Sequence, residues 1–354
     1  MKTDVKTDIR ELTFAELRTY LELQGEKTFR ADQIYRWLHE KCAMSAEEMT
    51  NVPATLRRKL SDSFYTDGPK AVKELLSKED GTRKYLFALA DSNVIESVFM
   101  PYHHGNSVCI SSQVGCAMGC AFCASTIGGR VRNLSAAEML GQVYAISRLS
   151  GERVSNVVVM GSGEPLDNYD ELVRFIRMLT GEKGLNISQR NITVSTCGLV
   201  PGIRALAQEH FAITLALSLH ASSQEKRERL MPIARRYPLD EVMDAVAYYH
   251  EQTGRRVTFE YSLVAGENDT PEDASQLADL IRGPGVHVNL IPVNPVRERG
   301  FSAPDRTGVI RFQNALQRKG INATIRREMG RDINGACGQL RRSYREETPG
   351  KDTT

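Results

Sequence analysis

The sequence predicts an α/β protein built on a partial (β/α)6 barrel, preceded by an N-terminal helical accessory domain and a small β-hairpin region. From Ser107 onwards, short runs rich in Val, Ile and Leu alternate with longer amphipathic segments. This alternation is typical of strand–helix–strand units and a parallel sheet. Before Ser107, apolar residues first follow helical spacing and then alternate with polar ones. Six strand-like runs are too few for a complete barrel of about eight strands, so we expect a partial one.

The N-terminal region is predicted to be helical. In FRADQIYRWLHEK, the apolar residues Phe29, Ile34, Trp37 and Leu38 fall on one helix face. Residues 69–101 then alternate in KYLFAL and NVIESVFM, which indicates a β-hairpin across an acidic turn. We therefore divide the chain into a helical accessory domain, a β-hairpin linker region, the barrel and a disordered tail, with the bounds 1–66, 67–105, 106–345 and 346–354.

The predicted barrel consists of strand-like runs and the amphipathic segments between them. The runs are, in chain order, SVCISSQVG, NVVVMG, NITVST, ITLALSL, VTFEYSLV and HVNLIPVN. Helical spacing occurs at 135–149, 168–180, 240–252, 272–282 and 306–319. Because the chemistry of such barrels gathers where the strands end, polar residues at those ends are candidate site residues.

The composition is that of an ordinary globular protein. The 354 residues include 46 Lys and Arg against 44 Asp and Glu, and 41% are hydrophobic, which excludes intrinsic disorder. No apolar run reaches the roughly 18 residues that cross a bilayer, and MKTDVKTDIRELTF lacks the apolar core of a signal peptide. We therefore expect a soluble, cytoplasmic protein that has no membrane partner.

Positive charge is concentrated near the C-terminus. Residues 297–345 contain twelve Lys and Arg against four Asp and Glu. Such a segment could contact phosphates, although charge alone favours an ordinary solvated surface.

Seven cysteines are an odd number in a long chain, which favours metal binding or thiol chemistry over a disulfide framework. Cys116, Cys120 and Cys123 form a C-x3-C-x2-C pattern directly after the first barrel run. Three thiolates at this spacing can bind a [4Fe–4S] cluster and leave one iron open to another molecule. A structural zinc site is the alternative, and it needs a fourth ligand such as His103 or His104.

The pattern and its place in the barrel resemble the radical S-adenosylmethionine (SAM) superfamily, whose open iron chelates SAM. Ser162-Gly163-Glu164-Pro165, at the end of NVVVMG, resembles the GGEP-like element that holds the methionyl amine of SAM. Polar residues end other strands too, and any one of them could be an ordinary loop residue. Together with that element, the resemblance assigns to SAM binding the residues Gly163, Glu164, Ser195, Ser218, Leu219, His220 and Asn294.

Two further cysteines identify a subfamily. Cys109 precedes the triad on the same strand, and Cys337 lies in DINGACGQL. The whole chain resembles the RlmN/Cfr family of RNA adenine methyltransferases. The resemblance covers nearly all of residues 10–342 and runs through FRADQIYRWLHEK, VIESVFMP, CISSQVGCAMGCAFCAS, VVVMGSGEPLDNYD, ITVST, LSLHA, RRVTFEY, VNLIPVNP and DINGACGQLR.

The resemblance implies a covalent route to a poorly nucleophilic ring carbon of adenine, with two SAM molecules per turnover. Cys337 takes a methyl group from the first SAM and becomes S-methylcysteine. The second SAM, on the cluster, yields a 5′-deoxyadenosyl radical that activates this methyl group for addition to adenine. Cys109 then attacks the Cys337 sulfur and releases the methylated base. Glu96 matches the family's proton acceptor, although strand alternation alone makes an outward-facing charge an equal alternative.

The context of Pro165 and of SQVGC resembles the RlmN branch, which methylates carbon 2 of adenosine in 23S rRNA and, next to the anticodon, in tRNA. The Cfr branch, which methylates carbon 8, remains the alternative. A radical SAM enzyme acting on a peptide or small molecule and, in another class, a zinc-stabilised RNA-binding protein are rival hypotheses. Cys197 and Ser162 depart from the family pattern, and Cys42 matches no motif and is interpreted as structural.

The expected partners are 23S rRNA and tRNA, with an electron donor such as flavodoxin. We expect the helical module at 10–63 to contribute to RNA recognition, and the target adenine must leave its stack to reach a barrel mouth. The sequence says nothing direct about oligomeric state, and we expect a monomer.

Overall fold

The structure is a computed structural model that describes residues 6–282, 286–296 and 298–333. Its main feature is one mixed sheet of ten strands in the described part of the chain, in the order β1-β2-β3-β4-β7-β8-β9-β10-β11-β12. The strands are β1 (Lys70–Leu76), β2 (Arg83–Ala88), β3 (Val94–Met100), β4 (Asn106–Ile110), β7 (Val154–Val159), β8 (Ile192–Thr196), β9 (Thr214–Ser218), β10 (Val257–Leu263), β11 (His287–Pro292) and β12 (Asn322–Ile325).

From β4 to β12 every neighbouring pair of this sheet is parallel, as in a partial barrel. The predicted α/β fold is therefore confirmed, and each of the six predicted runs contains a strand of the sheet. β12 is a seventh parallel strand that the sequence did not indicate. The first run is broken after Ile110, and its end forms a separate hairpin from β5 (Gln113–Gly115) and β6 (Arg130–Asn133).

The antiparallel part of the sheet precedes the barrel. β2 and β3 form the predicted hairpin, and β1 adds a further antiparallel strand beside β2. β3 in turn pairs with β4, so residues 67–105 extend the sheet of the barrel. This pairing places the hairpin residues beside the first barrel strand.

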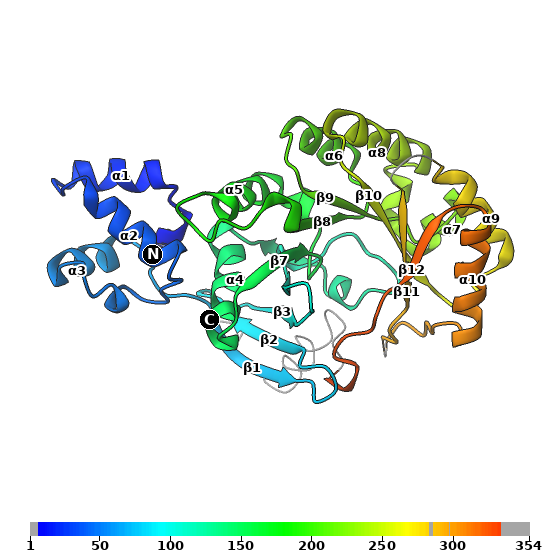
Figure 1. Ribbon diagram of the computed structural model, residues 1–354, viewed down its shortest axis with the longest axis horizontal. Coiled ribbons are helices and arrows are strands. Elements are labelled where there is room, and N and C mark those ends of the chain that lie inside the picture. Colours follow the sequence, from blue (N-terminus) through cyan, green and yellow to red (C-terminus); the bar gives the residue numbers. More distant parts are fainter. Residues whose placement is uncertain (1–5, 283–285, 297, 334–354) are drawn as a thin grey trace.

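Helices α1–α3 lie at one end of the long axis and α9 and α10 at the other (Figure 1). Several helices begin with a reciprocal cap, as Ser135 and Glu138 do at α4 and Thr270 and Asp273 at α9. The helices are α1 (Phe14–Leu23), α2 (Phe29–His39), α3 (Ala54–Ser63), α4 (Ala136–Ser150), α5 (Tyr169–Thr180), α6 (Val200–Gln208), α7 (Gln224–Leu230), α8 (Leu239–Thr253), α9 (Pro271–Leu280) and α10 (Arg306–Arg318).

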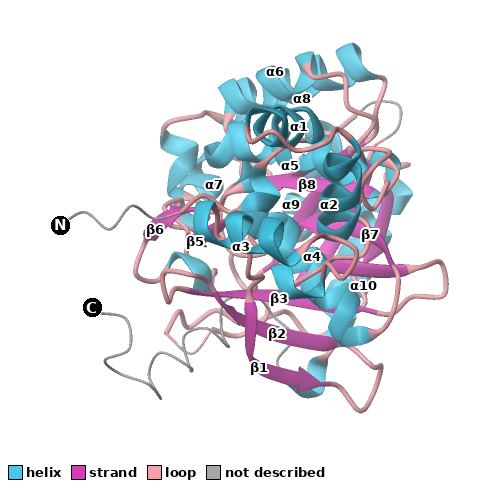
Figure 2. Cartoon of the chain, turned by 90° about the vertical axis from the view of Figure 1, so that its left-hand side faces the viewer, coloured by secondary structure: helices cyan, strands magenta, loops and turns pink. Residues whose placement is uncertain are grey.

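The helical module α1–α3 has its own apolar core, which includes Leu17, Ile34 and Leu60. It packs on the barrel in front of α4 and α5 (Figure 2). At this contact the buried His39 ring is 2.9 Å from the Tyr144 hydroxyl of α4, and Arg174 of α5 donates to the Glu11 carbonyl. Both described interactions are polar, so the module is joined to the barrel by specific bonds as well as by packing.

Candidate functional site

The register of the main sheet brings the candidate residues onto one face. In the antiparallel part, Lys84 lies opposite Val98, and Val98 lies opposite Cys109. Glu96 is two residues before Val98 and therefore projects from the same face. On the parallel strands, the residues that project from this face include Val158, Thr193, Thr214 and Ser218 of β9, Glu260 and Asn289. The alternate residues, such as Val108 and Leu215, belong to the apolar core. This shared face, which we call the polar face, carries the polar residues together with Val98 and Val158 and faces away from that core.

The three cysteines of the triad lie in one loop between β5 and the short helix Ala124–Thr126. Gly115, at φ +79°, turns the chain into the loop, and a side chain there would overlap the Gly129 carbonyl. The Cys116 N–H donates to that carbonyl at 3.1 Å. The Thr126 hydroxyl donates to the carbonyls of Cys120 and Cys123. Backbone bonds therefore fix both ends of the loop.

The thiols of this loop are held in their neutral form when nothing is bound. Burial raises the pKa of Cys116 to about 12 and also raises the pKa values of Cys120 and Cys123. Negative charge on a neighbouring thiol raises the pKa values of Cys116 and Cys120 further. A bound metal centre would supply the positive charge that ionises them.

The donor set fits an iron–sulfur cluster better than a single metal ion. Among the described residues, no three His, Cys, Asp or Glu side chains are grouped as ligands of one ion. His103 and His104, the candidate fourth zinc ligands, are exposed, and His104 stacks on Tyr102. A cluster spreads its thiolates over a cage of several irons, so its ligands stand further apart than those of zinc. Three soft thiols in one anchored loop suit that cage.

Gly163 and Glu164 lie four and five residues after the end of β7, next to Ser162, whose hydroxyl contacts Ser125. Gly163 has φ +110°, and a Cβ atom there would come within 2.6 Å of Gln113, so only glycine fits. The buried Glu164 carboxylate accepts from the N–H groups of Cys197 at 2.7 Å and Leu166 at 3.0 Å. Burial raises the pKa of Glu164, and these N–H groups oppose the rise. Glu164 thus links the ends of β7 and β8, a structural role that the sequence did not indicate.

Ser195 and Ser218 face one another where β8 and β9 end, with their hydroxyl oxygens 3.3 Å apart. Leu219 and His220 follow Ser218, and both of their N–H groups donate to the Glu260 carbonyl. His220 adopts a left-handed conformation at φ 57°, and its Nδ1 accepts from the Ser262 N–H at 2.9 Å. The structure therefore brings these four predicted residues together at adjacent strand ends.

Sequence analysis missed two residues that hold this segment. Asn268 is fully buried and donates to the carbonyls of His220 and Ser262, both at 2.7 Å. Glu260 projects from the polar face, and its carboxylate accepts from Asn289 at 2.9 Å. An acidic residue inside the apolar run VTFEYSLV was a signal for Glu260. Asn268 lies in a loop, where no local pattern singles it out.

Cys109 and Glu96 lie close together on the polar face. Glu96 is 2% exposed and forms an ion pair with the fully buried Lys84 at 3.2 Å, so its side chain does not face outward. Burial raises the pKa of the half-buried Cys109 thiol, and the positive charges of Arg326 and Lys84 act in the opposite direction. Cys337, the predicted methyl carrier, lies outside the described residues.

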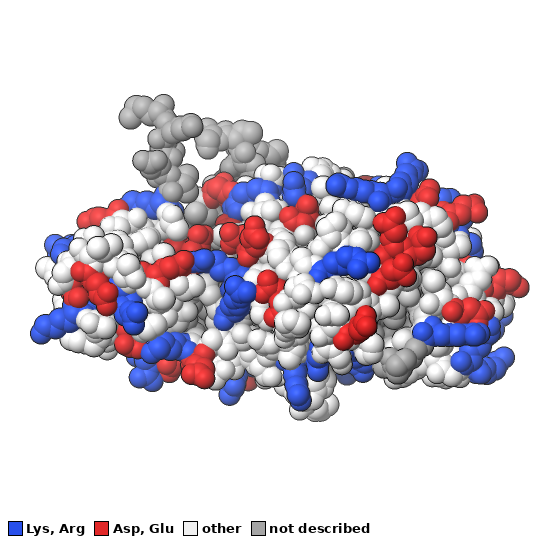
Figure 3. All heavy atoms as spheres, turned by 90° about the horizontal axis from the view of Figure 1, so that it is seen from above, with Lys and Arg blue, Asp and Glu red and all other residues white. Residues whose placement is uncertain are grey.

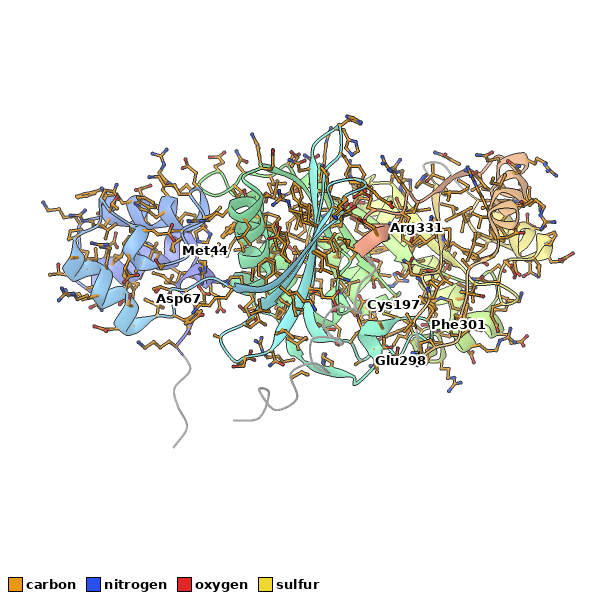
Figure 4. All side chains as sticks on the ribbon, turned by 90° about the horizontal axis from the view of Figure 1, so that it is seen from below. Met44, Asp67, Cys197, Glu298, Phe301 and Arg331 are labelled. Carbon is orange, nitrogen blue, oxygen red and sulfur yellow. The ribbon has the colours of Figure 1, made fainter. Side chains whose placement is uncertain are left out.

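The remaining candidates occupy varied positions. Asn294 is half-buried two residues after β11. Ser162 is buried, with its hydroxyl 3.0 Å from that of Ser125 in the triad loop. Cys42 is buried in the main core, where a structural role fits. Cys197 packs with Leu230 and Phe301 against the triad loop, and Figure 4 labels Cys197 and Phe301.

The surface shows no large field of one sign on the side seen from above, where basic and acidic side chains are mixed (Figure 3). None of the described helices combines the length and apolar character needed to span a bilayer. Residue 297 and residues 334–345 of the basic segment lie outside the described residues.

Two family models match the chain. Residues 110–281 match the radical SAM superfamily, and residues 7–65 match the N-terminal domain of the ribosomal RNA large subunit methyltransferases. The second match coincides with the helical module, and the first begins on β4 and ends just after α9.

Similar proteins cover almost the whole chain. A "Probable dual-specificity RNA methyltransferase RlmN" of Lachnoclostridium phytofermentans is 59% identical over 97% of this chain and 96% of that protein. Its counterpart in Clostridium perfringens is 53% identical over 95% of this chain and 97% of that protein. The crystal structure of a radical SAM methyltransferase from Sphaerobacter thermophilus superposes with a TM-score of 0.91 at 44% identity, covering 94% of this chain and 98% of that one.

Proposed function

The chain belongs to the RlmN family of radical SAM RNA methyltransferases, and from this premise we propose that it methylates carbon 2 of a specific adenosine in 23S rRNA and in tRNA, next to the anticodon. The observation that carries the proposal is the 59% identity over 97% of the chain to a relative named as a dual-specificity RNA methyltransferase. The polar face supports it, because Cys109 and Glu96 share that face with the strand ends that carry Ser195 and Ser218.

Cys116, Cys120 and Cys123 would hold a [4Fe–4S] cluster. With SAM bound, this group supplies a one-electron cleavage that produces a 5′-deoxyadenosyl radical. Gly163, Glu164, Ser195, the Ser218-Leu219-His220 segment and Asn294 would position SAM. Of these, Ser195 and Ser218 bond to one another through their hydroxyl groups, whereas Glu164 already accepts two backbone N–H groups.

Two thiols would carry the methyl transfer. Cys337 accepts a methyl group from one SAM molecule, loses a hydrogen atom from it to the radical derived from the second, and bonds through that carbon to the adenine. The Cys109 thiolate then attacks the Cys337 sulfur. An S–S bond forms, the S–C bond breaks, and its electron pair stays on the carbon, which takes up a proton to become the methyl group. Glu96 accepts the proton that leaves the ring carbon, and the unpaired electron of the adduct would return to the cluster that supplied it. A dithiol reductant of the cell reduces the Cys109–Cys337 disulfide by thiol–disulfide exchange before the next turnover.

We also propose the partners that the family resemblance implies. The substrates are 23S rRNA and tRNA, the electron comes from a donor such as flavodoxin, and the enzyme acts as a cytoplasmic monomer. The helical module would contribute to RNA recognition. Trp37 at its surface lies under the Lys41 ammonium, 3.7 Å from the ring centroid, beside a pocket also lined by Arg36 and Asn51. An aromatic ring with cationic neighbours suits unpaired nucleotides.

The test is an anaerobic assay of Cys109→Ala with an rRNA fragment and a tRNA, run beside Cys42→Ala as the control. Without its resolving thiol the variant should trap a covalent protein–RNA adduct, seen as a shifted band on a denaturing gel. Cys42 is buried in the apolar core, so its alanine variant should release methylated RNA.

Mass spectrometry of the released nucleoside then separates carbon 2 from carbon 8 methylation. Free product from Cys109→Ala at the rate of the unmodified enzyme would contradict the assignment of this thiol. Reconstituted protein that contains zinc but neither iron nor sulfide would contradict the proposed function as a whole.

A further inference from the structure

Arg227, in α7, is a buried cation with no described counter-charge. Its side chain is completely buried, and Nη2 donates to the Cys197 carbonyl at 2.6 Å. Nε and Nη1 are also buried and have no hydrogen-bond partner within residues 6–282, 286–296 and 298–333. Over the same residues, Arg227 forms no ion pair with a carboxylate. A guanidinium held in this way is costly, because it has left water without gaining an anion.

The groups around Arg227 belong to the triad loop and its support. Cys197, whose carbonyl accepts from Arg227, and Leu230, at the end of the same helix, pack in one apolar cluster with Met118, Cys120 and Phe122 of the triad loop. The Ala121 N–H donates to the Leu230 carbonyl at 2.8 Å, which fixes the triad loop to the end of α7. His220 does not compete for an anion, because burial and, second, the charge of Arg227 lower its pKa to about 3.

The backbone leaves space for this guanidinium. Gly198 follows Cys197 at φ +99°, and a Cβ atom there would lie 3.1 Å from Nη2 and 3.0 Å from a methyl group of Val242. A side chain at 198 would therefore push Nη2 or the Val242 methyl group aside by a few tenths of an ångström and would strain the backbone. The position of Arg227 is thus set by the surrounding chain rather than by an ion pair.

We propose that Arg227 is the counter-charge of the iron–sulfur cluster and makes that cluster easier to reduce. Three thiolates outweigh the positive charge of the cluster core, so the assembly is a net anion whose negative charge grows when it takes an electron from the external donor. A fixed buried cation stabilises the reduced form more than the oxidised form. The inference rests on the proposed function, since it requires a cluster on Cys116, Cys120 and Cys123.

Arg299 provides an internal comparison on the other side of the loop. It is half-buried, its Nη2 donates to the Thr126 hydroxyl at 3.0 Å, and its charge acts on Cys123. Because water screens a half-buried charge more strongly, its effect on the cluster should be weaker than that of Arg227.

The experiment is a redox titration of the anaerobically reconstituted full-length protein, without SAM, followed by electron paramagnetic resonance. The variants are Arg227→Met, Arg227→Lys and Arg299→Met. Arg10→Met is the matched control, because Arg10 is equally buried but is paired with Asp8 in the helical module. Thermal unfolding of each apo-protein accompanies the titration.

Arg227→Met should lower the ratio of reduced to oxidised cluster at a fixed potential about tenfold, which corresponds to a midpoint shift of about 59 mV for one electron. Arg227→Lys should retain most of the ratio, Arg299→Met should lower it less, and Arg10→Met should leave it unchanged. The apo-protein of Arg227→Met should unfold at or above the temperature of the parent, because a methionine removes an uncompensated buried charge.

A midpoint potential of Arg227→Met equal to that of the parent overturns the inference and leaves the proposed function intact. So does an unchanged midpoint together with weaker SAM binding in a separate equilibrium binding assay, which would assign Arg227 to the SAM carboxylate. Loss of the apo fold in both Arg227 variants would show a purely structural role and also overturns it. A parent protein that assembles no cluster overturns both proposals.

Discussion

Lys84 and Glu96 form an ion pair that is almost completely removed from water, with side-chain exposures of 0% and 2%. The two residues come from neighbouring antiparallel strands and share a face with Cys109. Burying two charges is tolerated when each neutralises the other, whereas removal of one leaves the other buried and uncompensated. Lys84 therefore positions the carboxylate that we assign as proton acceptor and keeps it beside the resolving thiol.

Lys84→Met should destabilise the protein by about 3–5 kcal/mol, because Glu96 is left as a buried charge without its cation. The double variant Lys84→Met/Glu96→Leu should recover most of that loss, since an apolar pair can replace a buried ion pair. Urea unfolding measures the stability, and a single-turnover assay measures methylation. The double variant should remain inactive, and an active double variant would contradict the role of Glu96.

At the scale of single residues, the sequence predicts which side chains can bind a metal centre, but not which side chains contact one another in the fold. The spacing of Cys116, Cys120 and Cys123 predicts a loop that binds iron or zinc, because all three ligands are close together in the sequence. The partner of Glu96 is twelve residues away on another strand, and alternation alone could not decide whether Glu96 faced outward. Asn268 holds two carbonyls that the register of β10 brings beside it, and such a role depends on tertiary structure.

At the scale of elements, the β5–β6 hairpin fixes the triad loop. Gly115→Ala should distort this hairpin, because the added Cβ atom would overlap the Gly129 carbonyl. Gly128→Ala is the matched control, since Gly128 also has a positive φ, +89°, but nothing lies within 4 Å of its added Cβ atom. Iron and sulfide analysis after anaerobic reconstitution should show loss of cluster in Gly115→Ala and near-normal content in Gly128→Ala. Equal content in the two variants would show that the hairpin does not fix the loop.

Elements with a strong local pattern were predicted well, and those that depend on their neighbours were missed. The predicted segments 168–180 and 306–319 agree with α5 and α10 to within one residue at each end. β1, whose sequence KAVKELL is mostly exposed, is a strand because its backbone pairs with the free edge of β2. The first barrel run is divided because Ser112 and Gln113 donate to the Ser162 carbonyl, which redirects the chain.

At the scale of the whole molecule, the repeated strand–helix pattern made the barrel predictable, whereas the docking of the helical module depends on side chains far apart in the chain. His39 is the clearest of these. Its ring is fully buried against Tyr35 and Tyr144, and burial lowers its pKa to about 3, with the charge of Arg10 as the second cause.

This burial predicts acid sensitivity of the module. In the unfolded chain His39 titrates near its ordinary value of 6.5, so stability is complete above that pH and falls between pH 6.5 and 3 as the unfolded state takes up the proton. At pH 5 the loss should be about 2 kcal/mol, at about 1.4 kcal/mol for each pH unit. Urea unfolding followed by the fluorescence of Trp37, the sole tryptophan, measures it. His39→Gln should flatten this dependence, and an unchanged slope would show that another group titrates.

The pairing of β3 with β4 has a consequence for how the protein can be divided. A fragment that started at residue 106 would keep every thiol of the triad loop. It would expose the backbone of β4 as an unpaired sheet edge and would lack both Lys84 and Glu96. The residues that we assign to catalysis therefore come from both the antiparallel strands and the barrel, and both parts are needed for the site. A barrel transferred to another protein would therefore have to include the antiparallel strands β1–β3.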